Sequence, residues 1–396
     1  MRKLTLDDLN AAATVGGPNS LTERTVLVPA GGEDAIISPA KYALPSKAGH
    51  GDPTYVFETR FVDDEPKKTV LVDSKNSQAN RLESVITGAL RDKAGMLGKI
   101  PHIVVNYPEA VGKSEFFDTE LPHRAFDAHV RIGDVEDKDR YMEARNSSLD
   151  NLRPLFELSP DTVLFGGWDS TRNKNQLRIP SVFVGEIFGV LADQSDYYAN
   201  EVHRSGARVD PVAAKVVFDK AAREEIVRDS LDLSDKTANN FKKDGKGSTI
   251  VVGAIPPTVS KDALDGVATS KIVRIHVLSF AILRSFRFGG SRESDVAIRA
   301  LIAAALLRAM AGSNAELNLR ANCILDEDSE PATELDERFG KKEELEPLTV
   351  ESTEDLLRQA YEQAHRVAGI EWDGQAFQVQ GNSTLFASGS DEVAGE

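Results

Sequence analysis

The sequence holds a single cysteine, Cys323, among its 396 residues. One cysteine can form neither an internal disulfide nor a multi-cysteine metal site, so we expect a protein of the reducing cytoplasm. The first residues, MRKLTLDDLNAAA, lack the apolar segment of a signal peptide, and Arg308 interrupts the longest apolar run, at residues 300–311. We therefore expect neither a signal peptide nor a membrane span.

Several short motifs of catalysis and nucleotide binding are also missing. The chain has no G-x-S-x-G, H-E-x-x-H or C-x-x-C, no G-x-G-x-x-G after an apolar run, and no GxxxxGK[ST]. The dinucleotide-binding and P-loop interpretations therefore lack their phosphate cradle, and nothing in the sequence supports an enzyme. We expect no cofactor and no bound metal.

Basic residues are in the minority: 47 Lys and Arg face 63 Asp and Glu, which gives a net charge of −16. Residues 326–355 carry thirteen acidic residues against three basic ones, a local balance of −10. The total disfavours a polyanionic partner. Because most of the excess is confined to one segment, a basic groove elsewhere is compatible with the composition.

Apolar periodicity predicts alternating strands and helices. Strands are expected at residues 69–72, 99–105, 162–165, 182–190, 271–288 and 316–325. Helices are expected from Ser77 or Gln78 through Leu90, and at residues 211–231, 295–310 and 353–367. Two β–α units separated by insertions predict an α+β fold of the ferredoxin-like, RNA-recognition-motif type, and a parallel doubly wound sheet is the alternative.

The stretch from Asp73 to Arg81, DSKNSQANR, consists almost entirely of hydrogen-bonding side chains at the start of a helix. A helix N-terminus favours an anion, and the guanidinium of Arg81 suits a phosphate. Ser77, Gln78 and Asn80 could bond sugar or phosphate oxygens. The alternative is a helix cap in which Arg81 pairs with Asp73 or Glu83.

Two further loops combine cations with other polar groups. In LPHRAFDAHVR, His123, Arg124 and Arg131 could contact a phosphate, or Arg124 could pair with Asp127. In GGWDSTRNKNQLR, Trp168 lies near Arg172, Lys174 and Arg178, a combination that can stack a base and neutralise phosphates. The alternative for Trp168 is a core anchor at a tight turn.

A fourth loop, SFRFGGSRES, places Arg284, Arg287 and Arg292 around a glycine pair ahead of a helix. Glycine lets a backbone approach a phosphate closely, so this loop also suits a polyanion. Each of the four loops is weak on its own, and together they favour a single cationic furrow that grips ribose-phosphate.

The order of five segments resembles a known family. DSKNSQANRLE, LPHRAFDAHVR, SPDTVLFGGWDS, GAIPP and LRSFRFGG, over residues 27–325, are similar to the backbone subunit of type I-G (formerly I-U) CRISPR interference complexes, in the Cas-seven branch of the RAMP superfamily. The resemblance implies a hand-like RAMP domain with an RNA-recognition-motif palm and inserted finger and thumb. On this basis the palm comprises about 68–100, 160–190 and 268–326, the insertions 101–159 and 191–267, and the acidic C-terminal extension with its mobile tail 327–396.

The resemblance also implies a function. Several copies of such a subunit line up head to tail along one CRISPR RNA, grip its backbone without regard to sequence, and leave most bases free to pair with target DNA. The implied partners are CRISPR RNA, further copies of the chain, the large subunit, the guide-end-binding subunit and target DNA, with no membrane. The implied role is antiviral defence without catalysis in this subunit, because a recruited helicase-nuclease cuts the DNA.

The resemblance implies that the SQANR, PHR and GGWDS segments and a glycine-rich thumb contact RNA. The thumb is expected at residues 241–257, although the Lys-Pro-Ser lead-in of the family is missing. The RNA-binding residues expected from the loops and the resemblance are Ser74, Asn76, Ser77, Gln78, Asn80, Arg81, His123, Arg124, Trp168, Ser170, Arg172, Lys174, Arg178, Lys242, Lys243, Lys246 and Arg287.

Two other functions stay open. Related backbone subunits of type III complexes cut target RNA with a loop aspartate, for which Asp169 or Asp73 would be the candidate. A metal-dependent small-molecule enzyme could use His123, Asp127 and His129, although their spacing does not place all three on one helical face.

Overall fold

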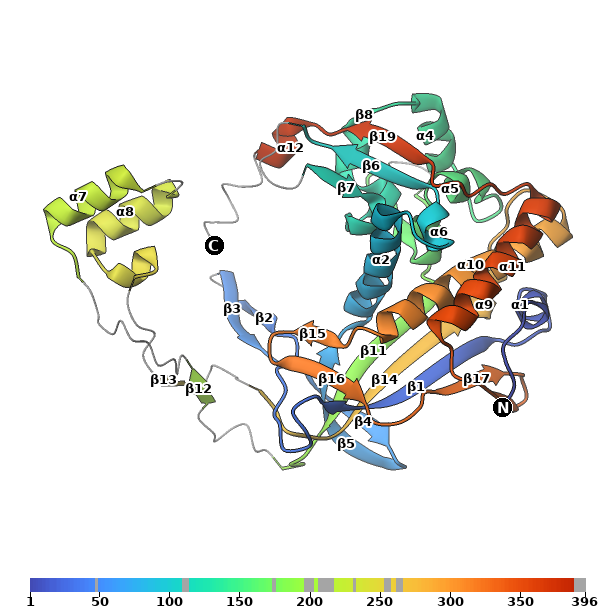
Figure 1. Ribbon diagram of the computed structural model, residues 1–396, viewed down its shortest axis with the longest axis horizontal. Coiled ribbons are helices and arrows are strands. Elements are labelled where there is room, and N and C mark those ends of the chain that lie inside the picture. Colours follow the sequence, from blue (N-terminus) through green and yellow to red (C-terminus); the bar gives the residue numbers. More distant parts are fainter. Residues whose placement is uncertain are drawn as a thin grey trace. The chain divides into compact units, whose positions relative to one another are not determined.

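The computed structural model describes residues 1–46, 49–108, 114–172, 176–195, 203–205, 217–230, 233–252, 258–260 and 266–387. The chain divides into two compact units (Figure 1). Unit 1 comprises Met1–Ala40, Phe57–Ala192 and Ala268–Phe386, and unit 2 comprises Lys41–Val56, Asp193–Val267 and Ala387–Glu396.

Unit 1 is built on a curled nine-stranded antiparallel sheet. Its strand order is β15 (Asn318–Arg320), β16 (Cys323–Glu327), β1 (Ser20–Pro29), β14 (Thr269–Ser279), β11 (Phe183–Leu191), β5 (Glu65–Asp73) and β4 (Phe57–Val62), and β17 (Ala332–Asp336) pairs with β1 and with β18 (Lys342–Leu345). Every pair in this sheet is antiparallel, so the parallel doubly wound alternative is wrong.

The central strands have ferredoxin-like connections. In space the order is β17, β1, β14 and β11, while the chain runs from β1 through helix α2 (Lys75–Asp92) to β11, and from β14 through helix α10 (Arg292–Asn314) to β17. Because β1 and β11 are both antiparallel to β14, they are parallel to each other. Helix α2 lies on the path between them, directly after β5, which itself pairs antiparallel with β11. The α+β fold is confirmed, and it is compatible with a ferredoxin-like palm that carries insertions.

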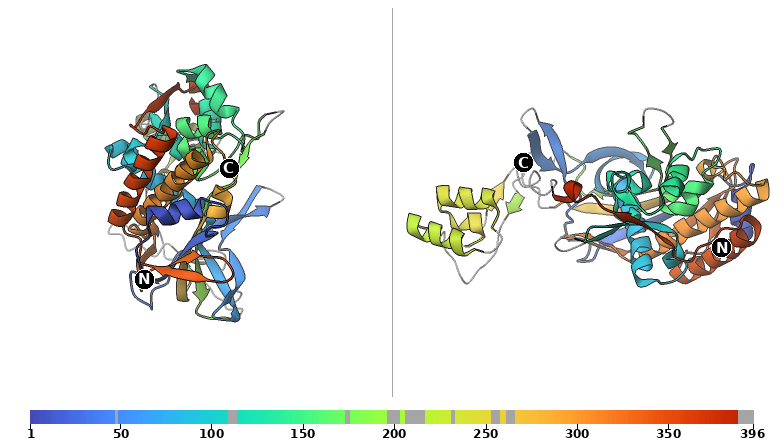
Figure 2. Two further views of the ribbon diagram at one scale, coloured as in Figure 1. Left: turned by 90° about the vertical axis from the view of Figure 1, so that its right-hand side faces the viewer. Right: turned by 90° about the horizontal axis from the view of Figure 1, so that it is seen from above.

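Helices α2, α10 and α11 (Val350–Ala368) lie together in unit 1, with α1 (Leu6–Ala12) against α10 (Figures 1 and 2). Helix α10 is long and apolar enough to span a membrane by composition, but 83% of that window is buried among the other elements. It is therefore the core helix of the unit. The expected helix at 353–367 is confirmed as α11, whose Leu356, Leu357, Ala360 and Ala364 are buried.

A second, smaller sheet of unit 1 has the order β7 (Glu115–Phe117), β6 (His102–Asn106), β19 (Ala376–Gln380) and β8 (Asp134–Val135). The same unit holds the short helices α3 (Ala128–Arg131), α4 (Lys138–Arg145), α5 (Arg153–Leu158), α6 (Pro160–Leu164), α9 (Phe280–Leu283) and α12 (Ser383–Ala387), and the ribbon of β9 (Gly167–Trp168) and β10 (Arg178–Ile179). Strand β19 lies between β6 and β8 and is parallel to β6, so residues 376–380 belong to this sheet.

Unit 2 contains the hairpin of β2 (Tyr42–Ser46) and β3 (Gly49–Thr54), the pair β12 (His203–Ser205) and β13 (Thr258–Ser260), and the helices α7 (Lys220–Asp229) and α8 (Asp235–Asp244). Phe218 and Phe241 pack edge to face, with ring centroids 5.6 Å apart, and hold the helical part together. In the expected thumb at 241–257, residues 253–257 lie outside the described residues. So do 211–216 and 231 of the expected helix at 211–231, and the tail beyond residue 387.

Several expected elements differ from the structure. Strand β1 was not expected, because Glu23 and Thr25 occupy buried positions between Leu21 and Leu27 and dilute its apolar alternation. The expected strand at 162–165 is helix α6, which begins at Pro160 and is buried on all sides, so it shows no helical periodicity.

The expected strand at 271–288 ends at Ser279, whose hydroxyl caps α9. The expected strand at 316–325 is the hairpin of β15 and β16, with Asn322 in a left-handed turn at φ 58°. Helix α2 begins at Lys75, because Ser74 caps it, and α10 begins at Arg292, because Ser291 caps it. Both helices therefore begin two or three residues before the expected starts.

Candidate nucleic-acid interface

The polar stretch at the start of α2 surrounds a carboxylate of the chain itself. Asp73 is fully buried, and its oxygens accept hydrogen bonds from Ser77 Oγ at 2.9 Å, Gln78 Nε2 at 2.6 Å, Arg81 Nε at 2.9 Å and Arg320 Nη2 at 2.5 Å. Asp73 is therefore the anion at this helix N-terminus. These hydrogen bonds confirm the alternative interpretation of this stretch, in which Arg81 pairs with Asp73.

The charge of Asp73 is stabilised in the interior. Burial by itself raises the pKa of a carboxyl, but the hydrogen bonds from Arg81 and Gln78 and the charge of Arg81 outweigh it and hold the pKa of Asp73 below its usual value. Gln78 is only 2% exposed, and its Oε1 lies 2.9 Å from His276 Nε2 on β14. The cluster of Asp73 with Ser77, Gln78, Arg81 and Arg320, here called the Asp73 cluster, thus ties α2 to the sheet.

This arrangement bears on the expected RNA contacts of the SQANR segment. Ser77, Gln78 and Arg81 are engaged by Asp73, and the hydroxyl of Ser74 accepts the backbone N–H of Ser77. RNA would have to compete with Asp73 for these side chains, and their contact with RNA stays a prediction. Asn76 and Asn80, by contrast, are exposed.

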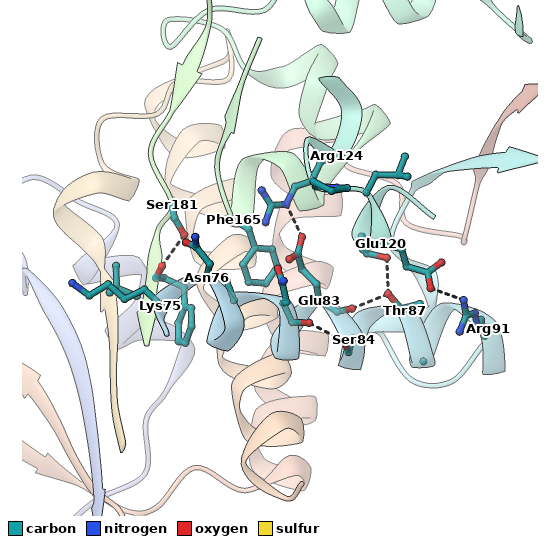
Figure 3. A pocket seen from close by; sticks show the side chains of 18 residues that line it. Lys75, Asn76, Glu83, Ser84, Thr87, Arg91, Glu120, Arg124, Phe165 and Ser181 are labelled. Atoms are coloured by element: carbon teal, nitrogen blue, oxygen red, sulfur yellow. Dashed lines mark hydrogen bonds and ion pairs between the residues drawn. The ribbon is translucent and has the colours of Figure 1, made fainter. Parts of the chain in front are cut away.

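A groove runs along the outer face of α2 (Figure 3). Its volume is about 820 Å³, and Asn76, Asn80 and Arg91 lie on the helical side of it. Asn80 follows Asn76 by about one helical turn and Arg91 follows Asn80 by about three turns, so the three side chains share one face of the helix. The remaining lining residues are Lys75, Ala79, Glu83, Ser84, Thr87, Gly88, Thr119, Glu120, Leu121, Pro122, Arg124, Phe165, Ser181, Phe183 and Val184.

Arg124 holds the inner wall of the groove together. Its Nε donates to Glu83 Oε1 at 2.5 Å and lies 3.3 Å from Asp161 Oδ2, and its Nη1 donates to the carbonyl of Gly166 at 2.9 Å. The residue adopts the left-handed conformation, φ 50°, to reach these partners. Arg124 therefore joins α2, α6 and the glycine loop, and this part of the wall is a fixed structural element.

Buried carboxyls lie behind this wall. Burial raises the pKa of Asp118 to about 7, and burial together with the nearby charge of Glu83 raises the pKa of Asp161 well above its usual value. Arg124 is thus the cation that faces Glu83 and Asp161, and its charge is engaged inside the wall of the groove. Arg91 is also paired, at 2.6 Å from Glu120, but it is exposed and can exchange that partner for a phosphate.

A second hollow, of about 450 Å³, shares Pro122, Arg124 and Phe165 with the groove. Trp168 lies at this hollow, is 49% exposed, and has the guanidinium of Arg178 at 4.3 Å from its ring centroid. His123, Gly166, Gly167, Ile179 and Pro180 complete the lining. The alternative of Trp168 as a core anchor is wrong, because half of its surface is exposed to solvent.

The rest of the GGWDS loop is held by α4. Asp169 is buried and accepts from Arg145 Nε at 2.7 Å and Nη2 at 3.1 Å, while Arg172 donates to the carbonyl of Arg145 at 2.7 Å. Ser170 is exposed at the loop surface, and Lys174 lies outside the described residues. Asp169 is therefore an anchor of the loop, and it presents no free carboxylate oxygen to a substrate.

The candidate metal ligands have other partners. Asp127 accepts the backbone N–H groups of His123 and His129, and His129 Nδ1 lies 2.5 Å from the hydroxyl of Tyr107. No group of three or more His, Cys, Asp or Glu side chains that could hold a metal ion occurs in the described part of the chain. His123 itself is exposed beside the hollow of Trp168.

The structure brings together three of the four predicted loops, since SQANR, PHR and GGWDS all contribute to the groove or the adjoining hollow. The fourth does not join them. Arg284 is bonded to the carbonyls of Ala12 and Pro18, and the backbone of Arg287 pairs with that of Leu149 and Leu152. Lys242, Lys243 and Lys246 are exposed on unit 2.

Lys75, Ser84 and Arg91 line the groove but are not among the residues predicted from the sequence to bind RNA. A signal for two of them existed, because Ser84 and Arg91 continue the helical face that begins at Asn76 and Asn80. The opposite wall, from Thr119 to Pro122 and from Ser181 to Val184, comes from distant parts of the chain, so no local pattern marks it.

Comparison with known proteins gives one result. Residues 21–194, less than half of the chain, match the model of a family described as CRISPR-associated protein GSU0053. Every residue that lines the groove and the hollow lies within this segment. No curated protein matches the chain. The match indicates a CRISPR-associated protein family and supports a role in a CRISPR system.

Proposed function

We propose that the chain is the CRISPR RNA-binding backbone subunit of a type I-G, Cascade-like interference complex, and that the groove along α2 grips the guide by its sugar-phosphate backbone. One observation carries the proposal: an open groove whose lining includes amide, hydroxyl and cationic side chains lies entirely within the segment that matches a CRISPR-associated family. Asn76, Asn80 and Arg91 can bond phosphate and ribose oxygens without reading a base.

In this proposal further copies bind head to tail along the same RNA in the cytoplasm, together with the large subunit and the guide-end-binding subunit. The guide then pairs with target DNA. The exposed lysines of unit 2, Lys242, Lys243 and Lys246, add contacts to phosphates.

We also propose that this subunit does not cut nucleic acid. The two loop aspartates with which the sequence could support an RNase, Asp73 and Asp169, are buried and bonded to arginines, so neither is available to hold a metal or activate water. Incubating the guide-loaded complex with complementary RNA and a divalent metal tests this directly. Regularly spaced RNA fragments would show that the subunit is a nuclease.

Gly88 offers a sharp test of the groove. It lies on α2 at the groove, and a side-chain carbon added there would meet no atom within 4 Å beyond its chain neighbours and the backbone of its own helix. Gly88→Gln and Gly88→Glu should therefore both fold, and both replace a poor helix former with a good one. They differ by a single charge that points into the groove.

The measurement is the affinity for unstructured RNAs of unrelated sequence, taken at several salt concentrations. We expect wild type to bind these RNAs within a few-fold of one another, with affinity that falls steeply as salt rises. Gly88→Glu should bind about tenfold more weakly than Gly88→Gln. Equal affinities of the two variants would rule out the groove, and a wild type that binds no RNA at low salt would rule out the function.

A second measurement tests the assembly. Protein co-expressed with a CRISPR RNA should absorb as nucleoprotein and elute as a multimer, and protein expressed alone should elute smaller. The same particle size with and without the RNA would contradict the role of backbone subunit.

A further inference from the structure

The hollow next to the groove contains a side chain that phosphate binding does not need. Trp168 is 49% exposed, whereas the other tryptophan of the chain, Trp372, is 2% exposed. An exposed indole loses the favourable free energy of burial, and aromatic side chains left open beside a cation are a typical surface for stacking. The position of Trp168 therefore calls for a ligand with a flat, apolar face.

The chain holds Trp168 at this position through a short ribbon. Trp168 on β9 is the direct partner of Arg178 on β10. Gly166, at φ +86°, has no room for a Cβ, which would lie 2.6 Å from the carbonyl oxygen of Ile179. At Gly167 a Cβ would lie 2.8 Å from Thr162. The glycine pair thus lets β9 pack closely against the segments around it. The indole of Trp168 is therefore held in place before any ligand binds.

The hollow itself suits a planar ring. Pro122, Phe165, Ile179 and Pro180 give it rigid apolar walls, and its volume of about 450 Å³ holds a nucleobase with space to spare. The guanidinium of Arg178 already lies against the indole of Trp168. Both cations and nucleobases favour the face of an indole, so this ring suits either kind of group. Among the described residues that line the hollow, no array of buried hydrogen-bonding side chains is present that would select one base.

We propose that the hollow binds one unpaired nucleobase of the RNA, stacked on the indole of Trp168 beside Arg178. The proposal rests on the proposed RNA binding, and it identifies the base as the part of the nucleotide that the hollow binds. Because the hollow and the groove share Pro122, Arg124 and Phe165, a strand held by its backbone in the groove can turn one base into the hollow. Stacking accepts any of the four bases, so the site adds affinity without sequence preference.

Tryptophan fluorescence tests this in the full-length protein, because Trp168 is the exposed one of the two tryptophans. Binding of a short uridine-rich RNA should quench the emission and protect it from iodide. The same titration with Trp168→Phe should show no quenching of the remaining Trp372. An oligonucleotide with abasic sites throughout should bind more weakly than the RNA and leave the emission of wild type unchanged.

The variant Trp168→Ala should lose about tenfold in affinity for RNA, in the range found for stacking on one aromatic side chain, and should lose nothing for the abasic strand. Phe61→Ala is the matched control, because Phe61 is a 77% exposed aromatic that lines neither the groove nor the hollow. RNA that binds wild type tightly without changing its fluorescence, or that binds Trp168→Ala as tightly as wild type, would overturn the stacking site and leave the proposed function standing. Absence of RNA binding by wild type would instead contradict the proposed function.

Discussion

The two faces of the polar stretch at the start of α2 behave in opposite ways. On its inner face, Ser77, Gln78 and Arg81 turn toward the sheet and hold the buried carboxylate of Asp73. On its outer face, Asn76 and Asn80 point into an open groove. The residue types are alike, and their position on the helix decides which of them can reach a ligand.

The comparison shows why an arginine in a loop is weak evidence for a phosphate site. Arg81, Arg124 and Arg145 all have a buried carboxylate as partner, at 2.9, 2.5 and 2.7 Å. A buried charge needs such a partner, because leaving it unpaired is strongly destabilising. The predicted furrow is therefore smaller than expected: the groove depends on amides, hydroxyls, Lys75 and Arg91, and the paired arginines build its walls.

The largest effect should come from breaking the Asp73 cluster. Asp73→Asn keeps the shape of the side chain but leaves Arg81 and Arg320 without their counter-charge, so we expect the free energy of unfolding to fall by about 3 kcal/mol. Urea denaturation measures this, with Asp64→Asn in the exposed β4–β5 turn as control. A loss below about 0.5 kcal/mol would show that the cluster does not hold α2 to the sheet.

Wild type and Asp73→Asn should also differ in how their free energy of unfolding depends on pH in the acidic range. The folded pKa of Asp73 lies below the ordinary value of 3.8, so the stability that its charge supplies is present above that value and is lost as the pH falls through the folded pKa. The difference in unfolding free energy between wild type and Asp73→Asn should therefore be constant near neutral pH and shrink below about pH 4. A difference that stays constant to pH 2 would contradict the lowered pKa.

An intermediate effect is expected from the outer face. Arg91→Glu removes an exposed cation from the groove and adds an anion beside Glu120, so RNA affinity should fall about tenfold while stability changes by less than about 0.5 kcal/mol. Arg358→Glu on α11 is the matched control, because Arg358 is also exposed, helical and paired to an acid. Equal losses for the two variants would show a general charge effect and not a groove.

The smallest effect should come from unit 2. Lys242→Ala removes one exposed cation at the C-terminal end of α8, so we expect RNA affinity to fall two- to threefold and the slope of log affinity against log salt to fall by about 1. Binding curves at several salt concentrations measure both quantities. An unchanged slope would show that Lys242 does not contact the phosphates of the RNA. The same test applies to Lys243 and Lys246.

Local sequence patterns predicted the α+β class, helices α2, α10 and α11, and strands such as β11, because these elements have clear periodicity or apolar runs. They failed where tertiary burial overrides periodicity. Glu23 and Thr25 hide β1, and a fully buried α6 looks like a strand. The three loops at the groove could be named from the sequence, but the opposite wall at Thr119–Pro122 could not.

The sequence by itself determined that polar and cationic side chains would cluster at the start of α2, at Arg124 and around Trp168, and it determined the family to which residues 21–194 are similar. Only the tertiary structure decided which of those groups face solvent. Asp73, Glu83 and Asp169 are buried in the fold and take Arg81, Arg124 and Arg145 as partners, whereas Asn76, Asn80 and Trp168 remain open. The reason is physical: a buried carboxylate must be paired with a cation. Only folding decides which arginine comes close enough to be that cation.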